Sequence, residues 1–317
     1  MRCLLIGNYG VGNLGDEALR EYFLREFPEV EWTVLSANPG KSNEVPRLPF
    51  GVRSLFATWW RTIGAYRRVD AVVFGGGSLF TDSESSFACL LWWWHAFVAR
   101  LFRKPLFMAF QGVGPLRAFR SIWLTKWVFG RAAFISVRDE ASLKRLKGWN
   151  LGTEPILAFD PIFTLFASRK RQVNEQRVLV IIPRDNSGEE FLVAVSGKLA
   201  NSWDSVRVLL MRPGEEERHV ARQIQSMAKA PCQVAEITTQ DQLLGEISKA
   251  NEVVTQRYHG ALAAMALDVP VTIVPQSAGD KLQELHFLAG SDKSAEVLLR
   301  RVERGIEGLT SALRVVE

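Results

Sequence analysis

Cysteine is scarce in this chain of 317 residues, and its three copies, Cys3, Cys89 and Cys232, lie far apart. A disulfide framework needs an even, patterned set, and zinc ligands typically recur about two to four residues apart. Neither pattern is present, and no cluster of histidine, cysteine and acidic residues has metal-ligand spacing. We therefore expect no structural metal, and we predict a protein of the reducing cytoplasm.

Long hydrophobic runs are also missing. The most apolar stretch, residues 87–99, has 13 residues, whereas a membrane-spanning helix needs about 20. The first residues lead directly into a glycine loop, so we expect no signal peptide. A composition of 47% hydrophobic and 23% charged residues is typical of globular proteins and excludes the disordered and fibrous classes.

Acidic residues are absent between positions 85 and 138, although the chain has 34 of them in all. The same stretch holds eight basic residues: Arg100, Arg103, Lys104, Arg117, Arg120, Lys126, Arg131 and Arg138. One sign of charge over such a length favours an anionic partner. The tryptophans at 59–60 and 92–94 fit peripheral contact with an anionic membrane through segment 87–104, and they equally fit a domain core or an oligomer interface.

Short apolar runs alternate with amphipathic stretches along the chain, which indicates parallel sheets covered on both faces. In the first half the predicted strands are 3–7, 32–37, 71–77, 105–115 and 134–139. The pattern then restarts, with predicted strands at 178–184, 206–213, 233–238, 252–257 and 270–275.

A chain of this length suits two domains of about 150 residues each. Composition changes sharply at the polar segment 168–176, which we interpret as a linker. We predict an α/β protein with two Rossmann-like, doubly wound domains, 1–167 and 177–317, that face a cleft. Ligands of such sheets bind beyond the carboxyl ends of the strands.

A glycine-rich turn, residues 7–19, follows the first predicted strand. Glycine allows a left-handed backbone and a close approach of ligand to backbone, and the following helix start offers free N–H groups. Gly10 and Asn13 are thus candidate substrate contacts, and Asp16 is either the helix N-cap or a reactive carboxylate. The turn has no Walker lysine, and we expect no nucleotide cofactor.

Two further strand ends carry candidate binding groups. Three successive glycines, Gly75, Gly76 and Gly77, mark either a close approach to a ligand or a plain turn. Arg138 ends a later predicted strand, where a guanidinium can bind a carboxylate or phosphate through two N–H groups. The alternative there is an ion pair with Asp139 at the surface.

The segment 255–267 carries the sharpest pattern. Arg257 and His259 stand between a buried strand and an apolar helix, and on a continuing strand both side chains would face one side. A cation and a titratable imidazole beside a helix start suit an anion that must also exchange a proton. Lys281 follows the last predicted strand at the same edge, as either a surface lysine or a third cation of this site.

Taken in order, these segments resemble the polysaccharide pyruvyltransferase family. The matching pieces are G-x-x-G-x-x-N-x-G-D-E-A at 7–18, the triple glycine at 75–77, G-V-G-P at 112–115, S-V-R-D at 136–139, Asp160-Pro161 and R-x-H-G-A at 257–261. Their order and spacing cover most of the chain. One departure lies before Lys281, where residues 278–280 read Ala-Gly-Asp in place of the Tyr-Asp-Pro of similar proteins.

The resemblance implies a glycosyltransferase-B-like fold that needs no metal or cofactor. It implies transfer of pyruvate from phosphoenolpyruvate onto two hydroxyls of a cell-wall or exopolysaccharide sugar, an N-acetylhexosamine, as a ketal with release of phosphate. Donor-site roles are implied for Arg138, Arg257, His259 and Lys281, and an acceptor-side role for Asp16. Ketal formation must move protons, so we expect His259 to be the acid/base and Asp16 to engage an acceptor hydroxyl.

The expected partners are phosphoenolpyruvate and a sugar acceptor, free or lipid-linked, and not a nucleic acid. If the acceptor is lipid-linked, the protein would work at the inner face of the plasma membrane. Three alternatives stay open: a glycosyltransferase of the same fold that uses a sugar nucleotide, a non-catalytic module that binds anionic lipid or nucleic acid, and an interaction protein that uses its tryptophans as a hydrophobic patch.

Overall fold

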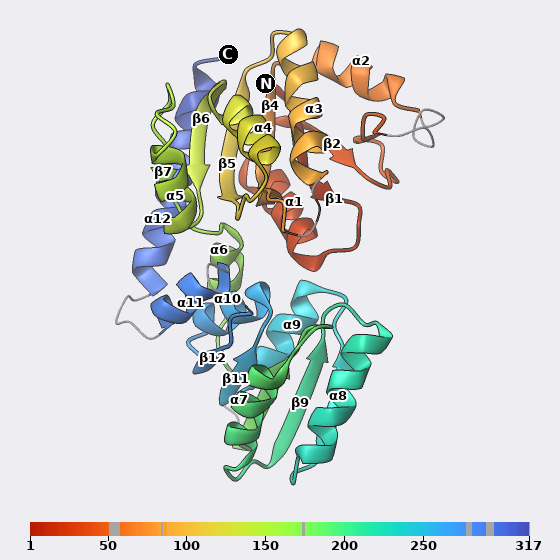
Figure 1. Cartoon of the computed structure of the whole chain (residues 1–317), viewed down its shortest axis with the longest axis vertical. Helices are drawn as coiled ribbons and strands as arrows, with labels where there is room; N and C mark the ends of the chain where they lie inside the picture. Colours follow the sequence, from red (N-terminus) through yellow and green to blue (C-terminus); the bar gives the residue numbers. More distant parts are fainter. Residues whose placement is uncertain are drawn as a thin grey trace. The chain divides into compact units, whose positions relative to one another are not determined.

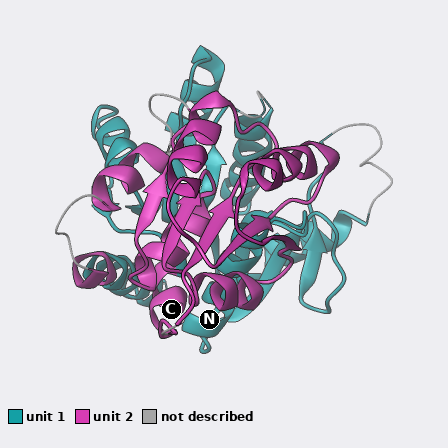
Figure 2. Ribbon diagram, turned by 90° about the horizontal axis from the view of Figure 1, so that it is seen from below, with its two compact units in different colours: residues 1–162, 300–317 teal, residues 163–299 magenta. Residues whose placement is uncertain are grey.

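The computed structural model describes residues 1–50, 58–83, 85, 87–172, 175–276, 281–289 and 295–316. The chain forms two compact units, coloured separately in Figure 2. Unit 1 comprises residues 1–162 and 300–317, and unit 2 comprises residues 163–299. Each unit is built on one sheet, in which every strand pairing is parallel.

The sheet of unit 1 has seven strands in the order β3-β2-β1-β4-β5-β6-β7. Parallel strands need crossover connections, and helices supply most of them. The strands are β1 (Arg2–Tyr9), β2 (Glu31–Ser36), β3 (Glu44–Pro46), β4 (Ala71–Phe80), β5 (Leu106–Val113), β6 (Ala132–Val137) and β7 (Ile156–Leu157).

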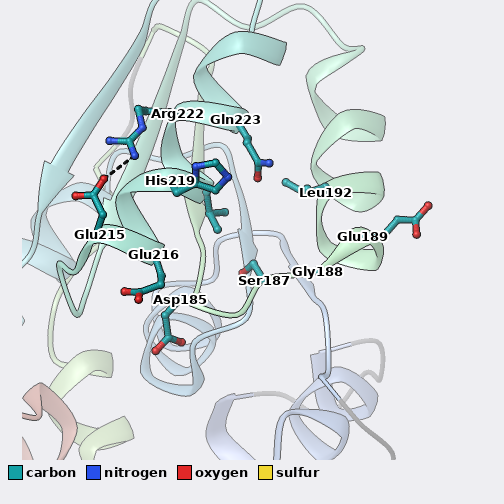
Figure 3. A pocket seen from close by; sticks show the side chains of 11 residues that line it. Asp185, Ser187, Gly188, Glu189, Leu192, Glu215, Glu216, His219, Arg222 and Gln223 are labelled. Carbon is teal, nitrogen blue, oxygen red and sulfur yellow. Dashed lines mark hydrogen bonds and ion pairs between the residues drawn. The ribbon is translucent and has the colours of Figure 1, made fainter.

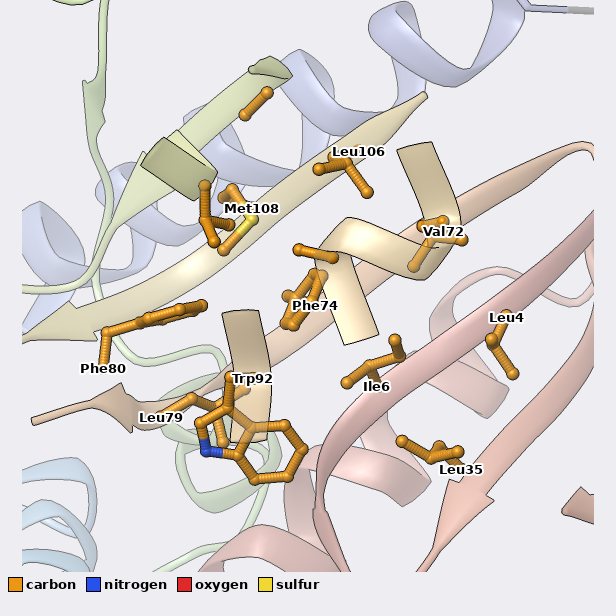
Figure 4. Packing of buried hydrophobic residues seen from close by; sticks show 14 of the residues in the cluster. Leu4, Ile6, Leu35, Val72, Phe74, Leu79, Phe80, Trp92, Leu106 and Met108 are labelled. Atoms are coloured by element: carbon orange, nitrogen blue, oxygen red, sulfur yellow. The ribbon is translucent and has the colours of Figure 1, made fainter. Parts of the chain in front are cut away.

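Four helices of unit 1 bury their apolar sides on one face of this sheet. They are α2 (Trp60–Arg68), α3 (Ala88–Leu101), α4 (Phe119–Phe129) and α5 (Glu140–Lys147). Figure 4 shows the core that results, in which Ile6, Phe74 and Met108 from three strands meet Trp92 of α3. Because residues of one face alternate along each strand, Leu4 and Ile6 of β1 and Val72 and Phe74 of β4 point into this core.

The other face of the sheet is covered by α1 (Leu14–Glu26) and by the last helix, α12 (Ala295–Arg314). Phe110 of β5 joins them, because its ring lies against Phe23 of α1, with centroids 6.2 Å apart, and against Gly305 of α12. The buried residues of α12 recur at helical spacing, at Leu298, Val302, Leu309 and Leu313.

Most of the last helix, α12, belongs to unit 1, which differs from the domain boundary that we predict from the sequence. The sequence-based division places everything after 176 in the second domain, whereas residues 300–317 group with unit 1. The reason is that the sheet of unit 1 has an apolar second face that α1 alone does not cover, and α12 supplies the missing layer.

Unit 2 repeats the plan with a five-stranded sheet in the order β10-β9-β8-β11-β12. Its strands are β8 (Val178–Ile182), β9 (Ser205–Leu210), β10 (Cys232–Glu236), β11 (Glu252–Thr255) and β12 (Val271–Ile273). Its helices are α6 (Ile162–Ala167, whose first residue belongs to unit 1), α7 (Glu189–Leu199), α8 (Glu215–Met227), α9 (Gln240–Ile247), α10 (Tyr258–Ala266) and α11 (Lys281–Ala289).

The predicted α/β class with two Rossmann-like sheets is confirmed, and Figure 1 shows the alternating strands and helices. The short elements β3, β7 and α6 have no counterpart among the predicted segments, and neither do α11 and α12. None of the described helices combines the length and apolar character that a membrane crossing requires.

Helix α3 carries a buried imidazole on the side that packs against the core. His95 is fully buried, and its Nδ1 lies 2.8 Å from the hydroxyl of Tyr66. Burial, with a smaller contribution from the Arg47 guanidinium, lowers the pKa of His95 to about 3. This histidine is therefore a neutral core residue at ordinary pH.

Replacing Gly305 by alanine should destabilise unit 1 by about 1–3 kcal/mol, the usual cost of overpacking. The added methyl would lie 2.9 Å from the Ala158 side chain and would press on the buried ring of Phe110. Gly197 in α7 is the matched control, since a Cβ there meets nothing within 4 Å. Gly197→Ala should stabilise by about 0.5–1 kcal/mol, because helical glycine is unfavourable. Urea unfolding measures both, and equal shifts would contradict the α12 packing.

Candidate active site

The loop after β1 leads directly into helix α1. Gly10 and Gly12 both have φ of +77°, a left-handed conformation. Asn13 is the N-cap of α1, with its side-chain oxygen accepting from the N–H of Gly15 at 3.0 Å. The N-cap interpretation of Asp16 is therefore wrong, because Asp16 lies within the first turn of the helix. Gly10 and Asn13 have structural tasks here, and their contact with substrate stays a prediction.

Asp16 is half-buried at the carboxyl edge of the unit 1 sheet. The amide of Asn8 donates to Asp16 Oδ2 at 3.0 Å, and Arg47 donates to Asn8 Oδ1 at 3.0 Å. A Cβ on Gly77 would lie 3.3 Å from Asp16 Oδ1. The structure thus brings Asp16 and the triple glycine together, as expected for neighbouring strand ends.

The triple glycine does not end its strand. β4 continues to Phe80, and its register with β5 shifts between Gly77 and Phe80. Gly76 and Gly77 have φ of +79° and +82°, a conformation that only glycine adopts easily. One extra residue of β4 enters the ladder directly after them, between Gly77 and Phe80. Gly75 cannot carry a side chain either, since its Cβ would collide with Leu5 and with the Tyr9 hydroxyl, which donates to the Gly75 carbonyl at 2.9 Å.

Arg138 is buried, with 3% of the residue exposed. Its Nη1 donates to Asp160 Oδ2 at 2.8 Å, and its Nη2 donates to Ser78 Oγ at 2.6 Å. The surface pair with Asp139 is therefore not the main contact, although Asp139 Oδ2 lies 4.0 Å from Nε. Gly112 makes room for the guanidinium, because a Cβ there would lie 2.9 Å from Arg138 Nε.

Arg257 and His259 lie at the carboxyl edge of the second sheet. The expectation that both extend a strand is wrong, since β11 ends at Thr255 and Tyr258 already begins α10. The hydroxyl of Thr255 accepts the N–H of Arg257 at 2.9 Å and so turns the chain. Arg257 is the N-cap of α10, and His259, half-buried, lies in its first turn.

The guanidinium of Arg257 is fixed from two sides. Its Nη2 pairs with the carboxylate of Glu217, a fully buried residue of α8, and its Nε donates to the carbonyl of Pro183 at 3.1 Å. Glu217 also accepts the N–H of Arg212 at 2.9 Å. Arg257 is therefore held in a single orientation beside the start of α10, with its positive charge largely compensated.

A pocket of about 620 Å³ lies on unit 2 between the starts of α7 and α8 (Figure 3). Its lining is rich in carboxylates, and the Arg222 side chain pairs with Glu215 at 2.7 Å on its rim. The floor residue Ser187 donates to buried Gln256 Oε1 at 2.6 Å, which ties the pocket to the segment before Arg257. The pocket is lined by Asp185, Ser187, Gly188, Glu189, Leu192, Glu215, Glu216, His219, Val220, Arg222 and Gln223.

Lys281 is the first residue of α11. Its side chain, and the departing residues 278–280 before it, lie outside the described part of the chain, so its role stays a prediction. Within the described residues, histidine, cysteine and acidic side chains form no group of three or more that could hold a metal ion.

The partners of the two predicted arginines come from distant parts of the chain, whereas the partner of Asp16 lies eight positions away. Asp160 and Ser78 hold Arg138, Glu217 holds Arg257, and Asn8 orients Asp16. Ser78 follows the triple glycine and Asp160 belongs to the Asp-Pro pair, so both had a local signal. Glu217 stands in an ordinary run of three glutamates, which gives no sign of its burial.

Solved structures that are similar to the chain share its fold at low sequence identity. A protein from Anabaena, determined in complex with UDP and glucose, has a TM-score of 0.58 and 11% identity, covering 99% of this chain and 98% of that one. A UDP-N-acetylglucosamine 2-epimerase homologue from Listeria monocytogenes has a TM-score of 0.62 and 13% identity, covering 99% and 95%. A glycosyltransferase from Rickettsia africae has a TM-score of 0.60 and 10% identity, covering 99% and 98%.

These likenesses show the two-domain, glycosyltransferase-B-like fold. None of the curated proteins matches the sequence. The family model for polysaccharide pyruvyl transferase, in contrast, matches residues 13–277, from the N-cap of α1 to the segment just before α11. This range includes Asp16, the triple glycine, Arg138, Arg257 and His259. The chain therefore belongs to the polysaccharide pyruvyl transferase family.

Proposed function

We propose that this protein transfers pyruvate from phosphoenolpyruvate onto two hydroxyls of a cell-wall or exopolysaccharide sugar, forming a ketal. The observation that carries the proposal is the start of α10, where Arg257 and His259 stand together at a strand end within the region shared with the family. An N-acetylhexosamine, free or lipid-linked, is the proposed acceptor. No metal or cofactor is needed for this chemistry.

The reaction balances without a redox partner. Each of two sugar hydroxyl oxygens bonds to C2 of phosphoenolpyruvate, and the bond from C2 to the phosphate oxygen breaks. One hydroxyl proton ends on the methylene carbon, which becomes a methyl group, and the other leaves with inorganic phosphate. The protein must therefore accept protons from hydroxyls and supply one to carbon.

The start of α10 suits the anionic donor. The first N–H groups of a helix have no partner within it, and the helix dipole places positive potential at the same point. His259 lies in this first turn, so its imidazole is placed beside the anion-binding groups and is the proposed acid/base. Arg257 orients a planar guanidinium there, and charge-assisted bonds to carboxylate or phosphate are the strong ones.

The carboxyl edge of the first sheet supplies the remaining groups of the proposal. Asp16, oriented by Asn8, is the proposed partner of an acceptor hydroxyl. Gly77, where a Cβ would lie 3.3 Å from Asp16 Oδ1, keeps the strand end close to this carboxylate. Arg138 acts mainly through its buried pair with Asp160, which holds the strand end in place, and Lys281 is proposed as a further donor contact.

A glycosyltransferase that uses a sugar nucleotide is the second candidate. Similar folds include the Anabaena protein determined with UDP and glucose. The pocket between α7 and α8 has the volume for a sugar or nucleoside, and carboxylates such as Glu216 are acceptors for hydroxyls. The same carboxylates would repel a diphosphate, so the pyruvyl transfer is favoured.

The decisive assay offers the protein phosphoenolpyruvate with a panel of aminosugar acceptors and measures phosphate release. We expect release that depends on the acceptor, and a product heavier by the mass of one pyruvate ketal. Thermal stabilisation by phosphoenolpyruvate, and not by UDP-sugars, should accompany it, since a ligand stabilises the state that it binds. Protection by UDP-sugars alone, with sugar transfer from them, would establish the second candidate.

His259→Ala should lower kcat by about 10²–10⁴-fold, the usual contribution of a general acid/base, while the protein stays folded. His219→Ala is the control, because that imidazole is exposed on the pocket of unit 2 and has no role in the proposed transfer. Steady-state phosphate release with both variants tests the assignment. Near-normal turnover of His259→Ala would refute it.

Arg138→Ala should cost about 3–5 kcal/mol of stability, because it leaves the Asp160 carboxylate buried without its partner. Arg2→Ala removes the exposed pair with Asp70 from the same unit and should cost less than about 1 kcal/mol. Denaturation midpoints measure the difference. If Arg138→Ala were as stable as Arg2→Ala but lost phosphoenolpyruvate binding, Arg138 would be a donor ligand first and a structural residue second.

A further inference from the structure

Helix α3 divides its aromatic residues between the core and the outside. Trp92 and His95 are buried against the sheet, whereas Trp93 and Trp94 are only partly buried. The outward residues Leu90, Trp93, Trp94, Phe97 and Leu101 recur at i, i+3, i+4, i+7 and i+11, which is one face of a helix. This face is strongly apolar, although it is the side of the helix that the sheet does not cover.

Helix α4 extends the same surface, and Figure 1 shows α3 and α4 side by side over the sheet. Trp127 joins them, with ring centroids 5.9 Å from Trp93 and 6.1 Å from Phe97. One and two turns earlier, Trp123 and Phe119 are 52% and 81% exposed. We call this surface, from Leu90 to Leu101 on α3 and from Phe119 to Trp127 on α4, the α3–α4 face.

Exposed basic residues surround the α3–α4 face. Arg131 lies over the Trp127 ring, 4.1 Å from its centroid. No carboxylate within the described residues forms an ion pair with any of this set, and the Asp82 carboxylate accepts the N–H groups of Arg117 and Ala118 at the start of α4. The exposed basic residues are Arg100, Arg103, Arg117, Arg120, Lys126 and Arg131.

We propose that the α3–α4 face docks on the surface of an anionic lipid bilayer. Indole rings with guanidinium and ammonium groups around them are suited to the headgroup layer, where rings enter the acyl boundary and cations meet lipid phosphates. A second copy of this chain fits less well. In a two-fold dimer the same basic patch would face itself, and like charges across an interface are costly.

This docking goes beyond the transfer reaction and does not depend on it. It would hold the protein beside a lipid-linked acceptor, yet the α3–α4 face has no residue in the proposed donor or acceptor groups. Docking and turnover are therefore separable. Turnover of a soluble acceptor should be unchanged when residues of the α3–α4 face are substituted.

Sedimentation of the full chain with vesicles tests the proposal. We expect binding to phosphatidylcholine vesicles that contain phosphatidylglycerol, weak binding to pure phosphatidylcholine, and loss of binding as salt rises. Phe119→Ala with Trp123→Ala should lower the partition coefficient at least tenfold. Arg120→Glu with Lys126→Glu should lower it about 30-fold or more, because one basic residue at an anionic surface contributes about fivefold.

Matched controls use exposed residues elsewhere. Phe287→Ala removes an exposed ring from α11, and Arg25→Glu with Lys229→Glu makes the same change in charge on α1 and after α8. Both controls should bind vesicles as the unaltered chain does. Equal losses in the controls, or no binding to anionic vesicles at all, would overturn the proposal. A dimer in sedimentation velocity that Phe119→Ala with Trp123→Ala dissociates, without vesicle binding, would assign the face to a second copy.

Discussion

A guanidinium withdrawn from water must keep a carboxylate beside it, and this constraint recurs at the carboxyl edge of both sheets. Arg138 at the end of β6 pairs with buried Asp160, and Arg257 after β11 pairs with buried Glu217. Removing one partner of such a pair leaves an uncompensated charge in a medium of low dielectric, which costs several kcal/mol. Each pair therefore fixes a strand end to a second segment, and the groups proposed to bind substrate are built on these fixed points.

The same pairing changes how an anionic donor can be recognised. Summed charge from several arginines would attract phosphoenolpyruvate strongly, but an arginine already paired with a carboxylate contributes little net charge. Recognition in the proposed reaction then depends more on the direction of the hydrogen-bonding groups than on net charge. These groups are the N–H groups in the first turn of α10, which have no partner within the helix, and the His259 imidazole. The Arg257 guanidinium is held by Glu217 and by the carbonyl of Pro183. It can therefore offer a hydrogen bond in a fixed direction, but it adds little net positive potential to the site.

Local patterns in the sequence predict every described strand except the short β3 and β7, most of the helices and the strand-end position of the motif residues. They do so because burial imposes a spacing on each element separately. Local sequence patterns do not show which segments of the chain pack against each other or which side chains pair. The spacing of Leu298, Val302, Leu309 and Leu313 is that of an amphipathic helix, but nothing local says that it covers Phe110 of the first sheet. Glu217 and Asn8 escape prediction for the same reason, and His259 leaves its strand because the Thr255 hydroxyl starts a helix there.

The run of three tryptophans shows why adjacent identical residues need not share a role. Successive residues of a helix point about 100° apart, so Trp92 enters the core while Trp93 and Trp94 reach the outer side. A core position is sufficient to explain the first indole, since large buried rings contribute most to packing. The other two and Trp127 pack against the edge of the core and are only partly buried, and with the exposed rings of Phe119 and Trp123 they leave apolar area at the surface. Exposed apolar surface beside so many basic residues is better explained by a partner than by stability, because contact of apolar groups with water is unfavourable for the folded state.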